Sequence, residues 1–142
     1  MRGPLSPDEE PGVHTIWARR YRCRGCHATV TVLPRGALRG RYFSAPAIAL
    51  ACVMYGLSGA SLGATRARVA PWRSAEAGWP AMGRWLDAVA RRALFATVRP
   101  WPEPWPRRLQ AERVATSVLA MTSAAGPLGV RAFAGAALLA CA

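Results

Sequence analysis

The sequence predicts a small, mostly helical α+β protein with an N-terminal β-hairpin followed by a helix-turn-helix-type helical bundle. β-branched and aromatic residues gather in residues 13–33. Apolar residues recur at helical spacing further along the chain. A chain of 142 residues suffices for one domain with a modest core. We expect a disordered leader (1–12), a hairpin knuckle with a basic linker (13–41), a helix-turn-helix-like helical region (42–99), and a Pro/Trp connector with a C-terminal helix and an Ala/Gly-rich tail (100–142).

The charge balance favours an anionic partner. The net charge is +12, and all 19 cationic residues are Arg, against seven acidic residues. Such a balance is typical of proteins that bind nucleic acid or a membrane surface. A solvated Arg-rich surface in a GC-rich organism is the alternative. The hydrophobic content of 52% excludes wholesale disorder, and the length leaves no room for a multi-domain enzyme.

The cysteines and apolar segments predict a cytoplasmic protein. The four cysteines, at positions 23, 26, 52 and 141, do not form a disulfide framework. The leader, MRGPLSPDEEPG, has no apolar signal-peptide core. The apolar run 45–57 is too short to span a membrane. A membrane hairpin in residues 114–142 is a weaker alternative, because Gly126 and Pro127 interrupt the apolar pattern.

The hairpin begins at Val13, turns at the sequence CRGC and ends before Pro34. Its second arm alternates, with Val30 and Val32 on one face and threonines on the other. The segment 19–41 contains no acidic residue. Its seven arginines, the candidate phosphate contacts, are Arg19, Arg20, Arg22, Arg24, Arg35, Arg39 and Arg41.

Four later segments are predicted to be helical: 44–56, 61–70, 81–95 and 107–124. Ser44 and Ser61 are the expected N-caps of the first two helices. The sequence PWPEPWP at 100–106 predicts either a stiff extended connector or an aromatic-proline clasp over the core. The tail after Pro127 is left unassigned.

One cluster has the residue types of a metal site. Cys23 and Cys26 are spaced so that both thiolates of a tight turn can bind one zinc ion. His14 is the candidate third ligand, and the set stays incomplete because a structural zinc site uses four. Cys23, Cys26 and His27 also match the Cys-x-x-Cys-His pattern of covalent haem attachment. Two structural thiols without a metal are the third interpretation.

The order of the helices 44–56, 61–70 and 81–95 matches a helix-turn-helix module, in which the last helix enters the major groove. Arg84 and Arg91 on that last helix are then the candidate groove contacts. A plain three-helix bundle with solvated arginines is the alternative. The acidic residues are scattered singly, so we expect no catalysis, no small-molecule substrate, and a surface ion pair for Asp87.

Two stretches of the chain resemble a known family. The run RRYRCRGCHATVTVLPRGALRGRYFSAPAIALACVMYGLSGASL and the later GWPAMGRWLDAVARR resemble the zinc-ribbon and helix-turn-helix region of bacterial transposase-like, insertion-sequence-associated proteins. The resemblance covers about residues 13–95. It implies DNA binding, zinc held by Cys23 and Cys26 as the second ligand pair, and a reading helix that starts at Arg84 and Trp85.

The chain departs from that pattern in two places. The first Cys pair, expected before Val13, is absent, and so is an acidic catalytic domain. We therefore expect a non-catalytic, cytoplasmic protein that binds double-stranded DNA, either as a truncated mobile-element copy or as a stand-alone accessory, with a homodimer as a further option. The alternatives are a covalent-haem electron-transfer protein, a membrane-surface interaction protein, and a remnant without selected function.

Overall fold

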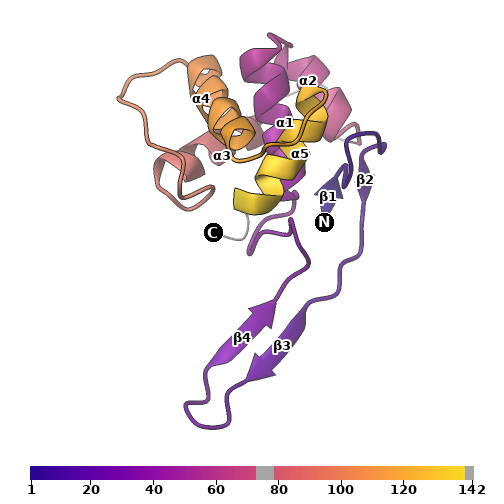
Figure 1. Cartoon of the computed structure of the whole chain (residues 1–142), viewed down its shortest axis with the longest axis vertical. Helices are drawn as coiled ribbons and strands as arrows, with labels where there is room; N and C mark the ends of the chain where they lie inside the picture. Colours follow the sequence, from indigo (N-terminus) through magenta and orange to yellow (C-terminus); the bar gives the residue numbers. More distant parts are fainter. Residues whose placement is uncertain (73–78, 140–142) are drawn as a thin grey trace.

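A computed structural model describes residues 1–72 and 79–139 and shows an α+β fold. Its helices form a body from which one hairpin projects as an arm (Figure 1). The helical elements are α1 (Ala45–Cys52), its π-helical continuation η1 (Val53–Leu57), α2 (Leu62–Val69), α3 (Pro80–Ala90), α4 (Arg107–Ala120) and α5 (Leu128–Leu139). The strands pair antiparallel, β1 (Arg2–Gly3) with β2 (Gly12–Val13) and β3 (Arg19–Arg22) with β4 (Thr29–Val32).

Helix α1 is the centre of the body, as its uninterrupted apolar sequence predicts. All eight of its residues are buried. Ser44 caps it, because the Ser44 hydroxyl accepts a hydrogen bond from the N–H of Ala47 at 3.1 Å. Helices α4 and α5 pack against α1, η1 and each other, and α5 lies in front of α1 in the view of Figure 1.

Glycines allow these helices to approach closely. A Cβ atom at Gly56 in η1 would lie 2.4 Å from the backbone nitrogen of Glu112 in α4. A Cβ atom at Gly135 in α5 would lie 2.0 Å from the carbonyl oxygen of Val118 in α4. Both crossings therefore depend on the absence of a side chain at the glycine.

The other helices agree with the sequence in position and differ at their ends. Helix α2 has the predicted cap, Ser61, whose hydroxyl accepts from the N–H of Ala64 at 3.1 Å. Helix α3 ends at Ala90 instead of residue 95, because Arg92 and Phe95 adopt left-handed φ angles of 56° and 47°. Helix α4 ends at Ala120 instead of residue 124.

The C-terminal third of the chain covers the core. Trp101 is buried in the core and Trp105 packs against it, as the clasp interpretation of residues 100–106 predicts. The unassigned tail forms α5, which buries Phe133 and Leu139 among other residues. In the described part of the chain, every helix falls short of the length and apolar character needed to cross a membrane.

The predicted disorder of residues 1–12 is not what the structure shows. Gly3 and Pro4 are buried, and Gly3 lies so close to α1 that a Cβ atom would come within 2.4 Å of the Ala47 Cβ. The Arg68 guanidinium in α2 donates hydrogen bonds to the carbonyl oxygens of Pro7 (2.8 Å) and Glu9 (3.1 Å). Backbone carbonyls hold this Pro-rich segment in place, and its composition does not reveal such contacts.

Candidate nucleic-acid interface

The arm is a two-stranded ribbon whose residues 17–32 are all exposed. Arg20 lies opposite Thr31 and Arg22 lies opposite Thr29, so these four side chains share one face. The other face carries Arg19, Tyr21, Val30 and Val32. The sequence predicted the threonine and valine faces, and the register now places two arginines with the threonines.

The second face of the arm is apolar and uncovered. Tyr21, Val30 and Val32 are 53%, 59% and 51% exposed. An isolated two-stranded hairpin is marginally stable in water, and apolar side chains across its strands are normally packed against something. This face of the arm therefore exposes apolar surface that no described residue covers.

The turn at the tip of the arm places Cys23 and Cys26 close together, and both are exposed and free. The N–H of Cys23 donates to the carbonyl of Ala28 at 2.8 Å, and the N–H of His27 donates to the carbonyl of Cys23 at 3.1 Å. Hydrogen bonds from the backbone N–H of Cys26, from the Cys26 side chain and from the N–H of Gly25 lower the pKa of the Cys23 thiol. The turn thus favours a thiolate, the form that binds metal.

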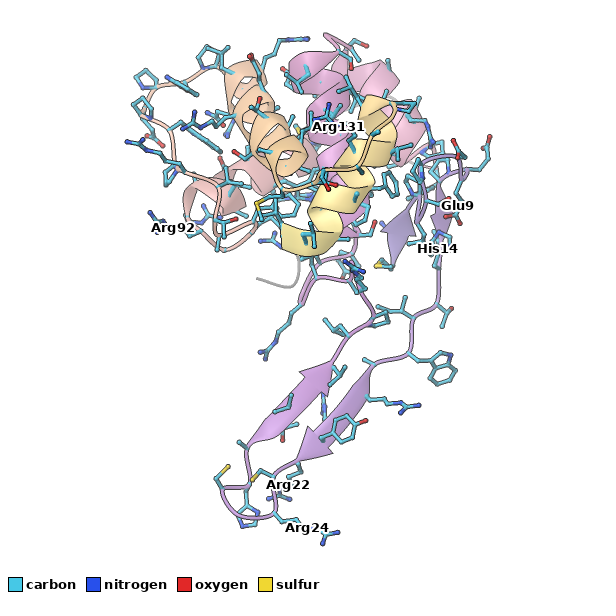
Figure 2. All side chains as sticks on the ribbon, in the orientation of Figure 1. Glu9, His14, Arg22, Arg24, Arg92 and Arg131 are labelled. Carbon is cyan, nitrogen blue, oxygen red and sulfur yellow. The ribbon has the colours of Figure 1, made fainter. Side chains whose placement is uncertain are left out.

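The predicted third ligand, His14, lies elsewhere. His14 is at the body end of the arm, whereas Arg22 and Arg24 mark the tip (Figure 2). The His14 Nε2 atom is 3.0 Å from the carbonyl oxygen of Gly3 and 3.8 Å from Glu9 Oε1. Among residues 1–72 and 79–139, no three His, Cys, Asp or Glu side chains are grouped to hold a metal ion. A single chain therefore brings together two of the expected zinc ligands and not His14.

Three adjoining hollows run from the arm across the basic linker (residues 33–43, between β4 and α1) to α3. The first, about 310 Å³, lies along the linker and includes Arg35 and Arg39. The second, about 390 Å³, has Arg20, Thr29 and Thr31 of the arm on one side and the linker on the other. The third, about 560 Å³, lies between the linker and α3. Neighbouring hollows share lining residues, including Arg39 between the first two and Arg41 between the last two.

These hollows are uniformly cationic. Among the described residues that line them, arginines supply all the charged side chains and none is acidic. Five of the arginines that the sequence predicts as DNA contacts line the hollows, together with Arg2, which no sequence pattern singles out. The five are Arg20, Arg35, Arg39, Arg41 and Arg84.

Other predicted contacts lie outside the hollows. Arg19, Arg22 and Arg24 are exposed on the arm, and Arg91 is exposed at the C-terminal end of α3. Helices α1, α2 and α3 follow one another in the order that the sequence predicts, and residues 73–78 in the predicted connection lie outside the described residues. Asp87 of α3 forms the expected surface ion pair, with Arg107 of α4 at 2.5 Å.

Comparison of this chain with known proteins identifies no similar protein. No protein-family model, curated protein or solved structure matches this chain. Function is therefore inferred from the arm, the hollows and their charges.

Proposed function

We propose that this chain is a non-catalytic protein that binds double-stranded DNA, related to the DNA-binding regions of transposase-like proteins. The observation that carries the proposal is the line of arginines in the three adjoining hollows, without an acidic neighbour among the described lining residues. Guanidinium groups pair with phosphate oxygens in a bidentate geometry, and phosphate contacts dominate the affinity of proteins for DNA.

The arm supports the same proposal. A two-stranded β-ribbon fits the major groove of B-DNA. The face formed by Arg20, Arg22, Thr29 and Thr31 offers guanidinium and hydroxyl groups, which hydrogen-bond to phosphates and to base edges. The arm therefore positions cationic groups beyond the body, and the linker arginines continue the contact toward α3.

The thiol turn is the proposed zinc element of this arm. Cys23 and Cys26 fit two positions of a tetrahedral zinc site, and the described chain does not supply the rest. Cys23 and Cys26 would hold the zinc ion there, and their coordination to it would cross-link the turn of a hairpin that has little packing of its own. We propose that two chains each contribute one thiol pair.

The test is the salt dependence of binding to a blunt DNA duplex, measured by fluorescence anisotropy. The logarithm of the association constant should fall with the logarithm of salt concentration, with a slope of about −0.9 for each phosphate neutralised. The variants Arg35→Ala and Arg39→Ala should each make the slope shallower by about 1. Arg113→Ala is the matched control, because Arg113 is an exposed arginine on α4 outside the three hollows.

Two results would contradict the proposal. A slope near zero for the unmodified protein would exclude phosphate contacts as the source of affinity. An equal loss of affinity in Arg113→Ala and in the linker variants would show that only the total charge matters. Either result would favour the alternative interpretation, in which the arginines form a solvated surface without a DNA partner.

A further inference from the structure

The largest of the three hollows is a cleft that the structure builds from three distant segments. Arg2 of β1, residues 40–43 of the linker, and Arg84 and Trp85 of α3 line its volume of about 560 Å³. The N–H of Arg2 donates to the carbonyl of Tyr42 at 2.6 Å, which fixes β1 to the linker. The ring of Trp85 packs edge-on against Phe43, with 5.0 Å between ring centroids, which fixes the linker to α3.

The cleft concentrates positive charge. Arg2, Arg41 and Arg84 line it, and no carboxylate does so among the described residues. The ion pairs found in the described part of the chain lie elsewhere, at His14–Glu9 and at Arg107–Asp87. Ala81, in the first turn of α3, also lines the cleft, and the N-terminal end of a helix carries partial positive charge. Three guanidinium groups around one cavity repel one another until an anion lies between them.

The cleft also offers an aromatic surface and more room than a phosphate needs. Tyr42 is 77% exposed at the cleft, with the Arg2 guanidinium 5.5 Å from the ring centroid. Its volume falls in the range of pockets that hold a whole small molecule, roughly 300–1,000 Å³. Arginine with an exposed aromatic ring is the combination that proteins use for unpaired nucleotides, with the base stacked and the phosphate neutralised.

The neighbouring hollow indicates that the ligand of the cleft is part of a nucleic-acid strand and not a free nucleotide. The cleft and the middle hollow share Gly40, Arg41 and Tyr42, and the middle hollow continues to Arg39 and Arg20. A nucleotide in the cleft would therefore have its next phosphates beside further arginines. Bases within a duplex are stacked on one another and cannot enter such a recess without being extruded.

We propose that this cleft seats one unpaired nucleotide of a DNA strand, with its phosphate on Arg41 and Arg84 and its base against Tyr42. The inference rests on the proposed function, since it assigns one end of the same arginine-lined surface to a single-stranded segment. The protein then binds a junction, with duplex along the arm and linker and an unpaired tail at α3.

The experiment compares a blunt duplex with the same duplex carrying a short unpaired tail, at fixed salt, by fluorescence anisotropy. The tail should strengthen binding by about tenfold, within the range that one base–aromatic stack gives. Tyr42→Ala should remove that gain and leave blunt-duplex binding within about twofold. Arg84→Ala should weaken binding of the tailed duplex more than binding of the blunt duplex, because Arg84 lines the cleft that holds the tail. Tyr42→Phe should keep the gain because the ring remains. Both altered side chains are exposed, so the fold should tolerate these changes.

Each further outcome decides the inference. Equal affinity for tailed and blunt duplex overturns it, and so does an equal loss for both DNAs in Arg84→Ala. Displacement of the tail by inorganic phosphate as effectively as by a deoxynucleoside monophosphate would show an anion site without base recognition, which also overturns it. If blunt duplex does not bind, the proposed function fails separately. Binding of a single-stranded oligonucleotide then tests the inference about the cleft. Binding that Tyr42→Ala removes supports the inference, and absence of binding by the unmodified protein overturns it.

Discussion

Nineteen arginines are equivalent in composition, but their side chains have different partners in the fold. Arg68 binds carbonyls of the leader, and Arg108 donates to the carbonyls of Tyr55 (2.9 Å) and Ala60 (3.2 Å) beside η1. Arg41 and Arg84 line the cleft instead. The sequence predicted the two cleft arginines from a local charge block and a helix pattern. It gave no means to separate Arg2 from the rest, because the partners of Arg2 lie about forty residues away in the chain.

Individual cysteines also differ in their surroundings, and we expect this difference to appear in the reactivity of their thiols. Burial raises the pKa of Cys52 to about 12, whereas hydrogen bonds from Cys26 and Gly25 lower the pKa of Cys23. Because the thiolate is the reactive form, iodoacetamide at neutral pH should modify Cys23 and leave Cys52 intact in the folded, metal-free protein. Peptide mapping by mass spectrometry measures this, with denatured protein as the control in which Cys52 reacts. Modification of Cys52 at the rate of Cys23 would contradict the buried position of α1.

Among the elements, those with strong local signals are the ones that the sequence predicted. Ser44 and Ser61 cap their helices as expected, since an N-cap depends on residues three positions away. The predicted end of α3 was wrong because Arg92 and Phe95 adopt left-handed conformations, which a sequence usually indicates by a glycine. Helix α5 was not assigned, because an Ala/Gly-rich segment shows no polar face to reveal its period.

The crossing of η1 and α4 gives a prediction about element packing. In Gly56→Ala the new methyl group would meet the backbone of Glu112, which cannot rotate away as a side chain does. We expect a loss of about 1–3 kcal/mol in the free energy of unfolding, as for other overpacked cores. Gly83→Ala in α3 is the matched control, because its Cβ atom has no described neighbour within 4 Å. The control should be neutral or more stable by up to about 1 kcal/mol, since alanine favours helix.

Urea denaturation followed by circular dichroism measures both variants. Equal stability of Gly56→Ala and the unmodified protein would mean that η1 and α4 lie further apart than described. The pair of glycines separates the two effects, because each sits in a helical element and only one lies against another helix backbone.

At the scale of the whole molecule, the candidate site depends on contacts that no local pattern contains. The arm and its two faces follow from alternation in the sequence, and Arg41 lies in a block of basic residues. The cleft exists because the leader, the linker and α3 meet. The composition of the leader predicts disorder, and a disordered segment offers no fixed place for Arg2 in a site. The sequence therefore predicts the positive charge of this surface but not the shape of the cleft.

The incomplete thiol site gives the prediction for the assembly. A tetrahedral zinc ion uses four ligands and one arm supplies two thiols, so two arms sharing one ion, as proposed, would complete the site. Elemental analysis of the purified protein should find about one zinc for two chains, and sedimentation should show a dimer that a chelator converts to monomer. Cys23→Ser and Cys26→Ser should each abolish the zinc and the dimer, whereas His14→Ala should retain both because His14 lies at the other end of the arm.

The proposed shared ion also offers a partner for the uncovered face of the arm. Two arms joined at their tips would bring the faces with Tyr21, Val30 and Val32 within reach of each other, and contact between them would remove apolar surface from water. Val30→Thr should then weaken the zinc-loaded dimer and leave the monomer unchanged, as measured by sedimentation. One zinc bound by a monomeric chain would contradict the shared site, and absence of zinc would leave the thiols as structural residues. A Soret band in the same sample would favour the covalent-haem alternative, because the turn also provides His27 beside the two thiols.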